Sequence, residues 1–408
     1  MSTLSISHYF PFNGIKIVSQ AVHHQARSTL IKMRPDKRCR PVCHACGSSD
    51  GVVHSKGHRR VVRDLNLAGA EAWLQVEYRK VWCPDCNGAR VERLSCCGTS
   101  QRVTYRLAKH IYDLCKHLSI KTVAEHLGLN PKTIRAVDRT FLEEDFGRTD
   151  YSELSIIAID EIALKKGHQY MTVVLDYLTG RVVWMGENRD KNTVDQFFAD
   201  MAPEQKALIK AVAMDMWQPF LNRVRHHCPK ARIVYDMFHL VRSFGLVIDK
   251  VRRAEYVKAD AEGKAVLKGS RYVLLKNAVN LTKNQRAKLK EVLAANKTLT
   301  AMYVLKDQLK ELYHYKARWY CDKALDAWCE MAEEIEGPKM AAFVRHLRKH
   351  KPEILNHCDY PIGTSRLEGV NNKIKLIKRR AYGYGDSEYF GLKIKQAFPG
   401  KKTTNFIG

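Results

Sequence analysis

Three short apolar runs, rich in β-branched residues, each lead into an aspartate. "SIIAIDE" reaches Asp160, "IKAVAMDMW" reaches Asp215 and "ARIVYDMFH" reaches Asp236. A hairpin pattern, "YMTVVLDYLTGRVVWMGE", and helical stretches stand between them. Short strands that alternate with helices predict a mixed α/β sheet. We expect each run to end at its aspartate, so that the carboxylates lie at the edge of the sheet where sites tend to be found.

An aspartate at the end of one strand is common, but Asp160 and Asp215 end separate runs. On adjacent strands they would lie side by side, and two like charges held that close need a cation. Carboxylate oxygens suit Mg²⁺ or Mn²⁺. Two such ions about 4 Å apart can bind the attacking and leaving oxygens of a phosphodiester. A third acid would complete the site, and Glu368 is the candidate.

Glu368 begins a polar stripe in the helical pattern "TSRLEGVNNKIKLIKRRAYGYG". Asn372, Lys375 and Arg379 follow at steps of four, three and four, so all four residues share one helical face. Asn371 and Lys378 flank this face. The stripe fits a metal ligand followed by groups that contact phosphates. The alternative is an ordinary solvated face of an amphipathic helix.

The charge of the chain points to a polyanionic partner. Its 408 residues include 69 Lys and Arg against 43 Asp and Glu, a formal net charge of +26. Nucleic acid is the commonest partner of so basic a folded chain, although a merely soluble basic protein is the alternative. No apolar run is long enough to span a bilayer. The opening "MSTLSISHYF" lacks the pattern of a signal peptide, so a cytoplasmic protein is expected.

Two CxxC pairs mark the N-terminal quarter: "CHAC" holds Cys43 and Cys46, and "CPDC" holds Cys83 and Cys86. Four thiolates can close a tetrahedral zinc site. Two β-like runs between the pairs, "RRVVRDL" and "WLQVEYRKVWC", are typical of a zinc ribbon. Redox or chance cysteines are the alternative, but redox motifs usually occur singly. Cys96 or Cys97 could also replace one ligand.

Residues 119–142, "SIKTVAEHLGLNPKTIRAVDRTFL", predict a helix-turn-helix. Gly128 breaks the first helix, Asn130 is a good N-cap and Pro131 suits the first helical position. A short helix followed by a polar, basic helix fits a unit that reads DNA, although any pair of packed helices could share the pattern. The residues expected to face DNA are Lys132, Thr133, Arg135 and Arg139.

These motifs together resemble the DDE transposases of bacterial insertion sequences, and most nearly the ISL3 family. The zinc knuckles, the helix-turn-helix, "AIDEIALKKGHQY", "AMDMW", "YDMFHLVR" and "SRLEGVNNKIKLIKRRAYGY" occur in that order. The resemblance implies an RNase H-like core in which Asp160, Asp215 and Glu368 hold Mg²⁺ or Mn²⁺. "DMFH" resembles the family's acid-and-His segment, so Asp236 and His239 are expected to support the metal ligands or to contact DNA. Glu161 should point to the other face of its strand.

The predicted fold is therefore multidomain α/β. Residues 1–100 would form a zinc-binding, DNA-binding domain and residues 101–150 the helix-turn-helix. Residues 151–246 and 352–408 would form the two parts of the catalytic core. Residues 247–351, rich in Lys, Ala and Leu, would form the helical insertion that the family carries between its second Asp and its Glu.

The expected function is that of a transposase that binds the terminal inverted repeats of its element. It would cleave one strand with activated water and join the 3′-hydroxyl to target DNA by transesterification. Its partner would be double-stranded DNA, and two or more copies of the chain would assemble because two ends must be joined. The cofactors would be the catalytic divalent cation and structural Zn²⁺. The protein would work in the bacterial cytoplasm near the nucleoid. Two alternatives stay open: a non-catalytic zinc and helix-turn-helix regulator, and an RNase H-like nuclease that transfers no strand.

Overall fold

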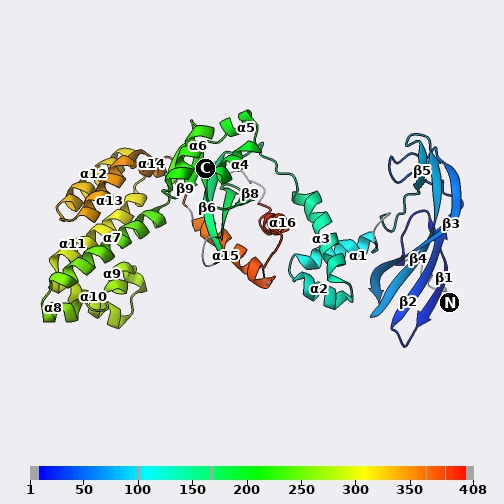
Figure 1. Ribbon diagram of the computed structural model, residues 1–408, viewed down its shortest axis with the longest axis horizontal. Coiled ribbons are helices and arrows are strands. Elements are labelled where there is room, and N and C mark those ends of the chain that lie inside the picture. The colour runs from blue at the N-terminus through cyan, green and yellow to red at the C-terminus, as the bar shows by residue number, and fades with distance from the viewer. Residues whose placement is uncertain (1–8, 99–101, 166–168, 364, 382, 401–408) are drawn as a thin grey trace. The chain divides into compact units, whose positions relative to one another are not determined.

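The computed structural model describes residues 9–98, 102–165, 169–363, 365–381 and 383–400. The chain divides into two compact units, Met1–Asp145 and Phe146–Gly408 (Figure 1). Within the described ranges no helix is both long enough and apolar enough to cross a membrane.

The first unit joins a five-stranded sheet to three helices. Its elements in chain order are β1 (Ile15–His23), β2 (Ser28–Pro35), β3 (Val52–Leu67), β4 (Ala70–Cys83), β5 (Gly88–Val91), α1 (Tyr105–Cys115), α2 (Ile120–Leu127) and α3 (Pro131–Phe146). The sheet has the order β1-β2-β4-β3, and β5 pairs with β4. The two β-like runs predicted between the cysteine pairs lie in β3 and β4, which form a long antiparallel pair.

The three helices follow the capping residues of the sequence. The Ser119 hydroxyl caps α2 by accepting from the backbone N–H of Thr122. Gly128 ends α2 in the left-handed region at φ 63°, which favours glycine. The Asn130 side chain then accepts from the N–H of Lys132 at 2.8 Å at the start of α3. The predicted helix boundaries are confirmed here because local capping determines them.

A buried carboxylate connects the sheet of the first unit to its helices. Asp64 on β3 is fully buried. It accepts hydrogen bonds from the Thr104 hydroxyl at 2.6 Å and from Nε of Arg106 on α1 at 2.7 Å. A buried charge that is paired and hydrogen-bonded in this way holds its partners in one geometry.

The second unit contains a second five-stranded sheet and most of the helices. Its first elements are β6 (Ile156–Lys165), β7 (Gln169–Asp176), β8 (Val182–Glu187), α4 (Lys191–Ala199), α5 (Pro203–Ala207), β9 (Ala211–Met214), α6 (Gln218–His227) and β10 (Arg232–Tyr235). The remaining elements are α7 (Met237–Lys258), α8 (Ala261–Leu267), α9 (Arg271–Leu275), η2 (Ala278–Asn280), α10 (Lys283–Ala295), α11 (Lys297–Glu311), η3 (Leu312–His314), α12 (Arg318–Glu333), α13 (Pro338–Lys349), α14 (Lys351–Leu355), η4 (Asn356–Cys358), α15 (Ser365–Arg380) and α16 (Ser387–Ala397).

The sheet of the second unit is mixed, as predicted. Its order is β10-β9-β6-β7-β8, in which β10, β9 and β6 run parallel and β7 and β8 form an antiparallel extension. One face packs against α4 and α6 through residues such as Ile157 and Phe198. The other face packs against α15 and α16 through residues such as Ala158 and Ile374. The sheet is therefore covered by helices on both faces.

Helices α7 to α14 form the insertion that the sequence predicted (Figure 1). The expected boundary after residue 246 falls inside α7, which runs without a break from the end of β10 into the insertion. The insertion also contacts the sheet edge: the Asn356 amide donates to the carbonyl of Ile233 at 2.8 Å. Its core is aromatic, because Trp328 packs against Phe244 and Phe343 at ring distances of 5.3 and 6.0 Å.

We expect Trp328→Ala to destabilise the second unit by about 3–5 kcal/mol, because the change leaves a cavity among packed helices. Trp328 is 1% exposed, and its Nε1 donates to the carbonyl of Leu305 at 2.8 Å. Trp319 lies on the same helix but is 62% exposed, so Trp319→Ala should change the free energy of unfolding by less than about 0.5 kcal/mol. Urea unfolding followed by circular dichroism measures both; equal effects would contradict this account of the core.

Candidate active site

Asp160 and Asp215 lie at the same level on neighbouring parallel strands. The register between β6 and β9 pairs Ala158 with Ala213, and each aspartate stands two residues beyond its member of that pair. Because side chains alternate along a strand, both carboxylates share the face of Ala158 and Ala213, which is covered by α15. The two acids that the sequence singled out are therefore brought together.

The expectation that the strand ends at Asp160 is wrong. β6 continues to Lys165, because its antiparallel pairing with β7 extends through the pair of Lys165 with Gln169. The parallel partner β9 is the strand that ends, at Met214, and Asp215 follows it. The side chain of Asp160 therefore reaches the cleft because the neighbouring strand β9 ends there, although β6 itself continues.

Asp236 directly follows β10 and begins α7. Its register neighbour is close to the other acids, because Tyr235 pairs with Met214. The Asp236 side chain is buried and accepts from the N–H of Phe238 at 3.1 Å, as the N-cap of α7. This carboxylate therefore has a structural partner of its own.

Helix α15 brings a third acid and an amide to the same edge. The Asn371 Nδ2 donates to Oδ2 of Asp160 at 2.6 Å, while Oδ1 of Asp160 accepts from the N–H of Glu161 at 2.8 Å. Glu368 lies one helical turn before Asn371 and is exposed. A cleft of about 570 Å³ is lined by Asp160, Glu368 and Asn371 together. Asn371 was only noted as flanking the polar face; its contact with Asp160 is tertiary and leaves no local signal.

The carboxyl groups of Asp160 and Glu161, at this edge of the sheet, are not fully neutralised by nearby cationic side chains, and their pKa values are raised. Burial raises the pKa of Asp160. Burial together with Asp215 and Asp160 raises the pKa of Glu161 to about 7. His239 lies with Nδ1 3.5 Å from Oδ2 of Asp215, and this contact raises the pKa of the imidazole. Crowded carboxylates that disfavour ionisation are what a bound cation would relieve.

Glu161 follows Asp160 on β6, and its side chain was predicted to point to the opposite face of the strand. The alternation places it with Ile157 and Ile159, on the side of α4 and α6. Its Oε1 is buried and has no hydrogen-bond partner within the described ranges. The guanidinium of Arg189 opposes the rise of its pKa, and stacks on Tyr170 at 4.1 Å. Glu161 thus adds negative potential beside the two aspartates.

Other residues that line the cleft come from the first turn of α7 and from η3 and η4. Tyr313 and His357 line it, together with Phe238 and His239. The Tyr313 hydroxyl donates to the carbonyl of Tyr235 at 3.2 Å, which ties η3 to the end of β10. Only His239 among these was expected at the site. The others come from parts of the chain whose packing a helical pattern does not reveal.

The polar stripe on α15 is exposed along its whole length. Glu368, Asn372, Lys375 and Arg379 all lie on the surface, and Asn372 and Lys375 also line the cleft. Arg379 lies one turn further along the helix, in a last turn that also carries Lys378 and Arg380. The stripe therefore leads from an acidic end in the cleft to a basic end outside it.

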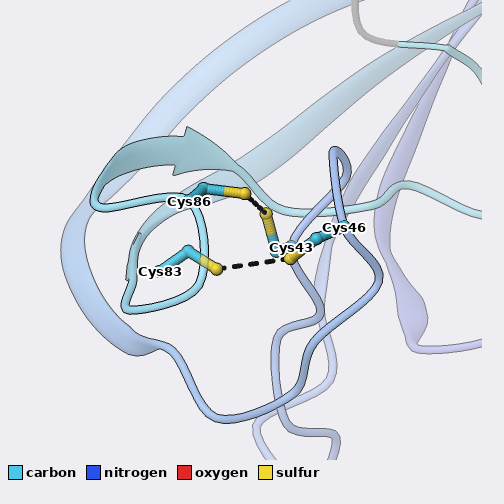
Figure 2. A group of neighbouring side chains, drawn as sticks. All are labelled: Cys43, Cys46, Cys83 and Cys86. Carbon is cyan, nitrogen blue, oxygen red and sulfur yellow. Dashed lines mark hydrogen bonds between the residues drawn. The ribbon is translucent and has the colours of Figure 1, made fainter.

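The four thiols of the CxxC pairs meet in the first unit (Figure 2). Sγ of Cys43 lies 3.9 Å from Sγ of Cys86, and Sγ of Cys46 lies 3.4 Å from Sγ of Cys83. All four sulfurs lie within 4.8 Å of one another. Zn–S bonds of about 2.3 Å in a tetrahedron place sulfurs about 3.8 Å apart, so the donor set fits Zn²⁺.

Backbone amides favour the thiolate form of Cys43. Hydrogen bonds from the N–H groups of Cys46 and Ala45 lower the pKa of Cys43 to about 6. Thiolate is the form that binds metal. Cys96 and Cys97 lie elsewhere: both are buried in the apolar cluster of the sheet, with their sulfurs 3.7 Å apart. The group that could hold a metal contains neither of them.

The second helix of the helix-turn-helix presents its expected residues unequally. Lys132 and Arg135 are exposed, whereas Thr133 and Arg139 are half-buried. Nε of Arg139 also donates to Glu143 at 2.6 Å, one turn further along α3. Lys132 and Arg135 are therefore the more exposed basic residues of α3.

Protein-family models match three regions of the chain. A family model described as "Transposase" matches residues 157–394. Two further models match residues 99–141, described as the helix-turn-helix domain of transposase family ISL3, and residues 40–86, described as the zinc-finger of transposases IS204, IS1001, IS1096 and IS1165.

Two relatives are similar over most of the chain. The transposase for insertion sequence element IS1001 of Bordetella parapertussis is 40% identical over 377 residues, 92% of both chains. The transposase for insertion sequence element IS1557 of Mycobacterium tuberculosis is 27% identical over 379 residues, 87% of this chain and 85% of the relative.

Cys83→Ser should remove about one equivalent of zinc from the purified protein, because the change deletes one of four ligands. Cys96→Ser is the matched control: Cys96 is as fully buried as Cys83 but lies outside the quartet. It should keep the zinc content of the wild type. Plasma emission spectrometry of the full chain after gel filtration measures both, and zinc loss from Cys96→Ser alone would assign the ligands differently.

Proposed function

Because the chain belongs to the ISL3 family of bacterial insertion-sequence transposases, we propose that it cleaves and joins DNA at the ends of such an element by a DDE mechanism. The observation that carries this proposal is the placement of Asp160 beside Asp215 and of Glu368 in the cleft that Asp160 lines. Asp160 and Asp215 are level on β6 and β9, and Glu368 shares the cleft of Asp160.

These three carboxylates would hold Mg²⁺ or Mn²⁺, since their oxygen donors suit hard divalent cations. Bound there, the ions would supply Lewis acidity to the phosphodiester and a lowered pKa to the attacking water. The strand order β10-β9-β6-β7-β8, with its parallel and antiparallel halves, supports the RNase H-like core that the family implies. The insertion between β10 and α15 has the position that the family's insertion would occupy.

The residues around the acids would hold them in place. Asn371 fixes one oxygen of Asp160, and the backbone of Glu161 fixes the other. His239, held beside Asp215, would balance its charge and present a polar group to the cleft. Asp236 would act through α7, whose first turn it caps. We therefore assign His239 and Asp236 as positioning residues.

DNA binding would use both units. The zinc module and α3 would engage the element's inverted repeats, with Lys132, Thr133 and Arg135 near the groove and Arg139 further along the helix. Asn372, Lys375 and Arg379 would contact phosphates of the strand that enters the cleft. The net charge of +26 supports a polyanionic partner. Two ends must be joined in one reaction, so the working form would be a dimer or larger.

Glu368→Gln should abolish cleavage without weakening end binding. Loss of a direct ligand should lower the nicking rate at least about 100-fold, since even residues behind the ligands matter by about 10–100-fold. The measurement uses the purified chain, a labelled duplex carrying the element end, and Mg²⁺, with a gel shift for binding. Strand-transfer products, measured in the same reactions, separate a transposase from a simple nuclease.

Glu388→Gln is the control, because Glu388 is an exposed acid of the first turn of α16 and lies outside the cleft. It should nick at the wild-type rate. If Glu368→Gln also nicks at that rate, Glu368 is not catalytic. If the wild type binds ends but never nicks them, the regulator alternative describes the protein better. Excision of a marked element in cells gives the same comparison in vivo.

Asn371→Ala should raise the Mn²⁺ concentration needed for half-maximal nicking by about tenfold or more, because Asp160 loses the donor that orients it. Asn372→Ala is the neighbouring comparison, because Asn372 is the next residue of α15, is exposed and also lines the cleft. It should weaken DNA binding and leave the metal dependence unchanged. A slower Asn371→Ala enzyme with unchanged Mn²⁺ dependence would show that Asn371 acts otherwise.

A further inference from the structure

A second group of metal-ligating side chains lies between the insertion and the segment that follows it, apart from the catalytic acids and the cysteine quartet. It consists of Cys321 on α12 and of His357 and Cys358 on η4. Each offers one ligand atom, and the three atoms lie within 4.8 Å of one another. Cys321 and His357 are buried and Cys358 is half-buried. Sequence spacing does not reveal this group, because 36 positions separate Cys321 from His357.

The imidazole of His357 is held in the form that binds metals. Its Nδ1 lies 2.7 Å from the carbonyl of Ile354, so Nδ1 carries the proton and donates it. Nε2 is then the unprotonated nitrogen, and it lies 3.6 Å from Sγ of Cys358. A histidine ligand usually has its other ring nitrogen bonded to a carbonyl or a carboxylate in this way. Stacking on Tyr313 at 4.5 Å further fixes the ring.

We propose that Cys321, His357 and Cys358 bind a thiophilic divalent cation, Zn²⁺, with water as the fourth ligand. Two sulfurs and one imidazole nitrogen are a donor set that zinc prefers over Mg²⁺ or Mn²⁺. Zn–S and Zn–N bonds of about 2.3 and 2.0 Å in a tetrahedron put sulfur and nitrogen about 3.5 Å apart. The observed 3.6 Å between Sγ of Cys358 and Nε2 of His357 fits that spacing.

The thiols have weak partners when no cation is bound. Sγ of Cys321 lies 3.4 Å from the carbonyl of Leu312, and Sγ of Cys358 lies 3.4 Å from the carbonyl of Tyr315. A thiol is a weak donor, so these contacts are readily exchanged for metal bonds. Binding would release the two thiol protons, and zinc affinity should therefore rise with pH.

The position of the cluster explains what such an ion would do. Cys321 belongs to the insertion, while Cys358 ends the segment that leads back to α15. Arg318, one turn before Cys321, already links the same two segments by contacts of 3.1 Å to Asn356 and Asp359. His357 itself lines the catalytic cleft. The ion would therefore hold α12 of the insertion to η4, which contributes His357 to the cleft. It would be a structural site that takes no part in DNA cleavage.

Zinc content of the full chain tests the proposal. The protein is purified under reducing conditions and dialysed in excess Mg²⁺, which keeps zinc from the carboxylates. The wild type should hold about two equivalents, one in each cysteine site, and Cys358→Ser and Cys46→Ser should each hold about one. Cys329→Ser is the matched control, because Cys329 is buried on α12 outside the cluster. It should hold about two.

Cobalt spectroscopy gives a second readout, which reports on the ligand set of the new site and not only on its metal content. Co²⁺ loaded into Cys46→Ser should show tetrahedral d–d bands with the weaker charge-transfer absorption of two thiolates, and His357→Gln introduced into that protein should abolish them. The proposal is overturned if the wild type holds only one equivalent, or if Cys358→Ser holds as much as the wild type. A Cys321–Cys358 disulfide in the reduced preparation, detected by mass spectrometry, would overturn it equally.

Discussion

Repulsion between carboxylates at the end of β9 is the constraint on which the second unit depends. Asp160 and Asp215 are level on adjacent strands, and together with burial they raise the pKa of the neighbouring Glu161 to about 7. The fold compensates from two directions: Asn371 reaches in from α15, and His239 from the first turn of α7. Both helices are therefore held to the acidic edge by polar contacts as well as by apolar packing. What remains uncompensated is the charge that divalent cations would neutralise.

The points at which the insertion joins the sheet explain why it can be large without disturbing the acidic edge. The chain leaves the sheet at Asp236, a capping residue, and returns at η4, where Asn356 bonds to the carbonyl of Ile233 on β10. Both points lie on the outer parallel strand, so the helices between them extend from one side of the sheet. The hydroxyl of Tyr313 on η3 also donates a hydrogen bond to the carbonyl of Tyr235, the last residue of β10. The insertion thus contributes a wall to the cleft while the acids stay on the sheet and on α15.

Much of this arrangement could be predicted from the sequence, because its signals are local. Strand runs, the caps at Ser119 and Asn130, the CxxC spacing and the stripe from Glu368 to Arg379 each reflect contacts within a few residues. The end of β6 could not be predicted, since its length depends on pairing with β7. The bond from Asn371 to Asp160 spans 211 positions and leaves no periodic trace. For the same reason Tyr313 and His357 were missed as residues of the cleft.

The two cysteine clusters show how far spacing can be trusted. In the first, each CxxC turn supplies two sulfurs at a fixed spacing, and backbone amides of the first turn lower the pKa of Cys43, so the motif is visible before folding. In the second, Cys321 joins His357 and Cys358 only after α12 packs beside η4. Adjacent His and Cys residues offer no turn of backbone amides, so the thiols there are satisfied by carbonyls until a cation replaces their protons. These three ligands are close together only when α12 and η4 are packed, so metal binding at this site depends on that packing. An ion between α12 and η4 would therefore require that the insertion is correctly packed, whereas an ion in the first cluster would require only that the segment before β3, which carries Cys43 and Cys46, meets the turn between β4 and β5.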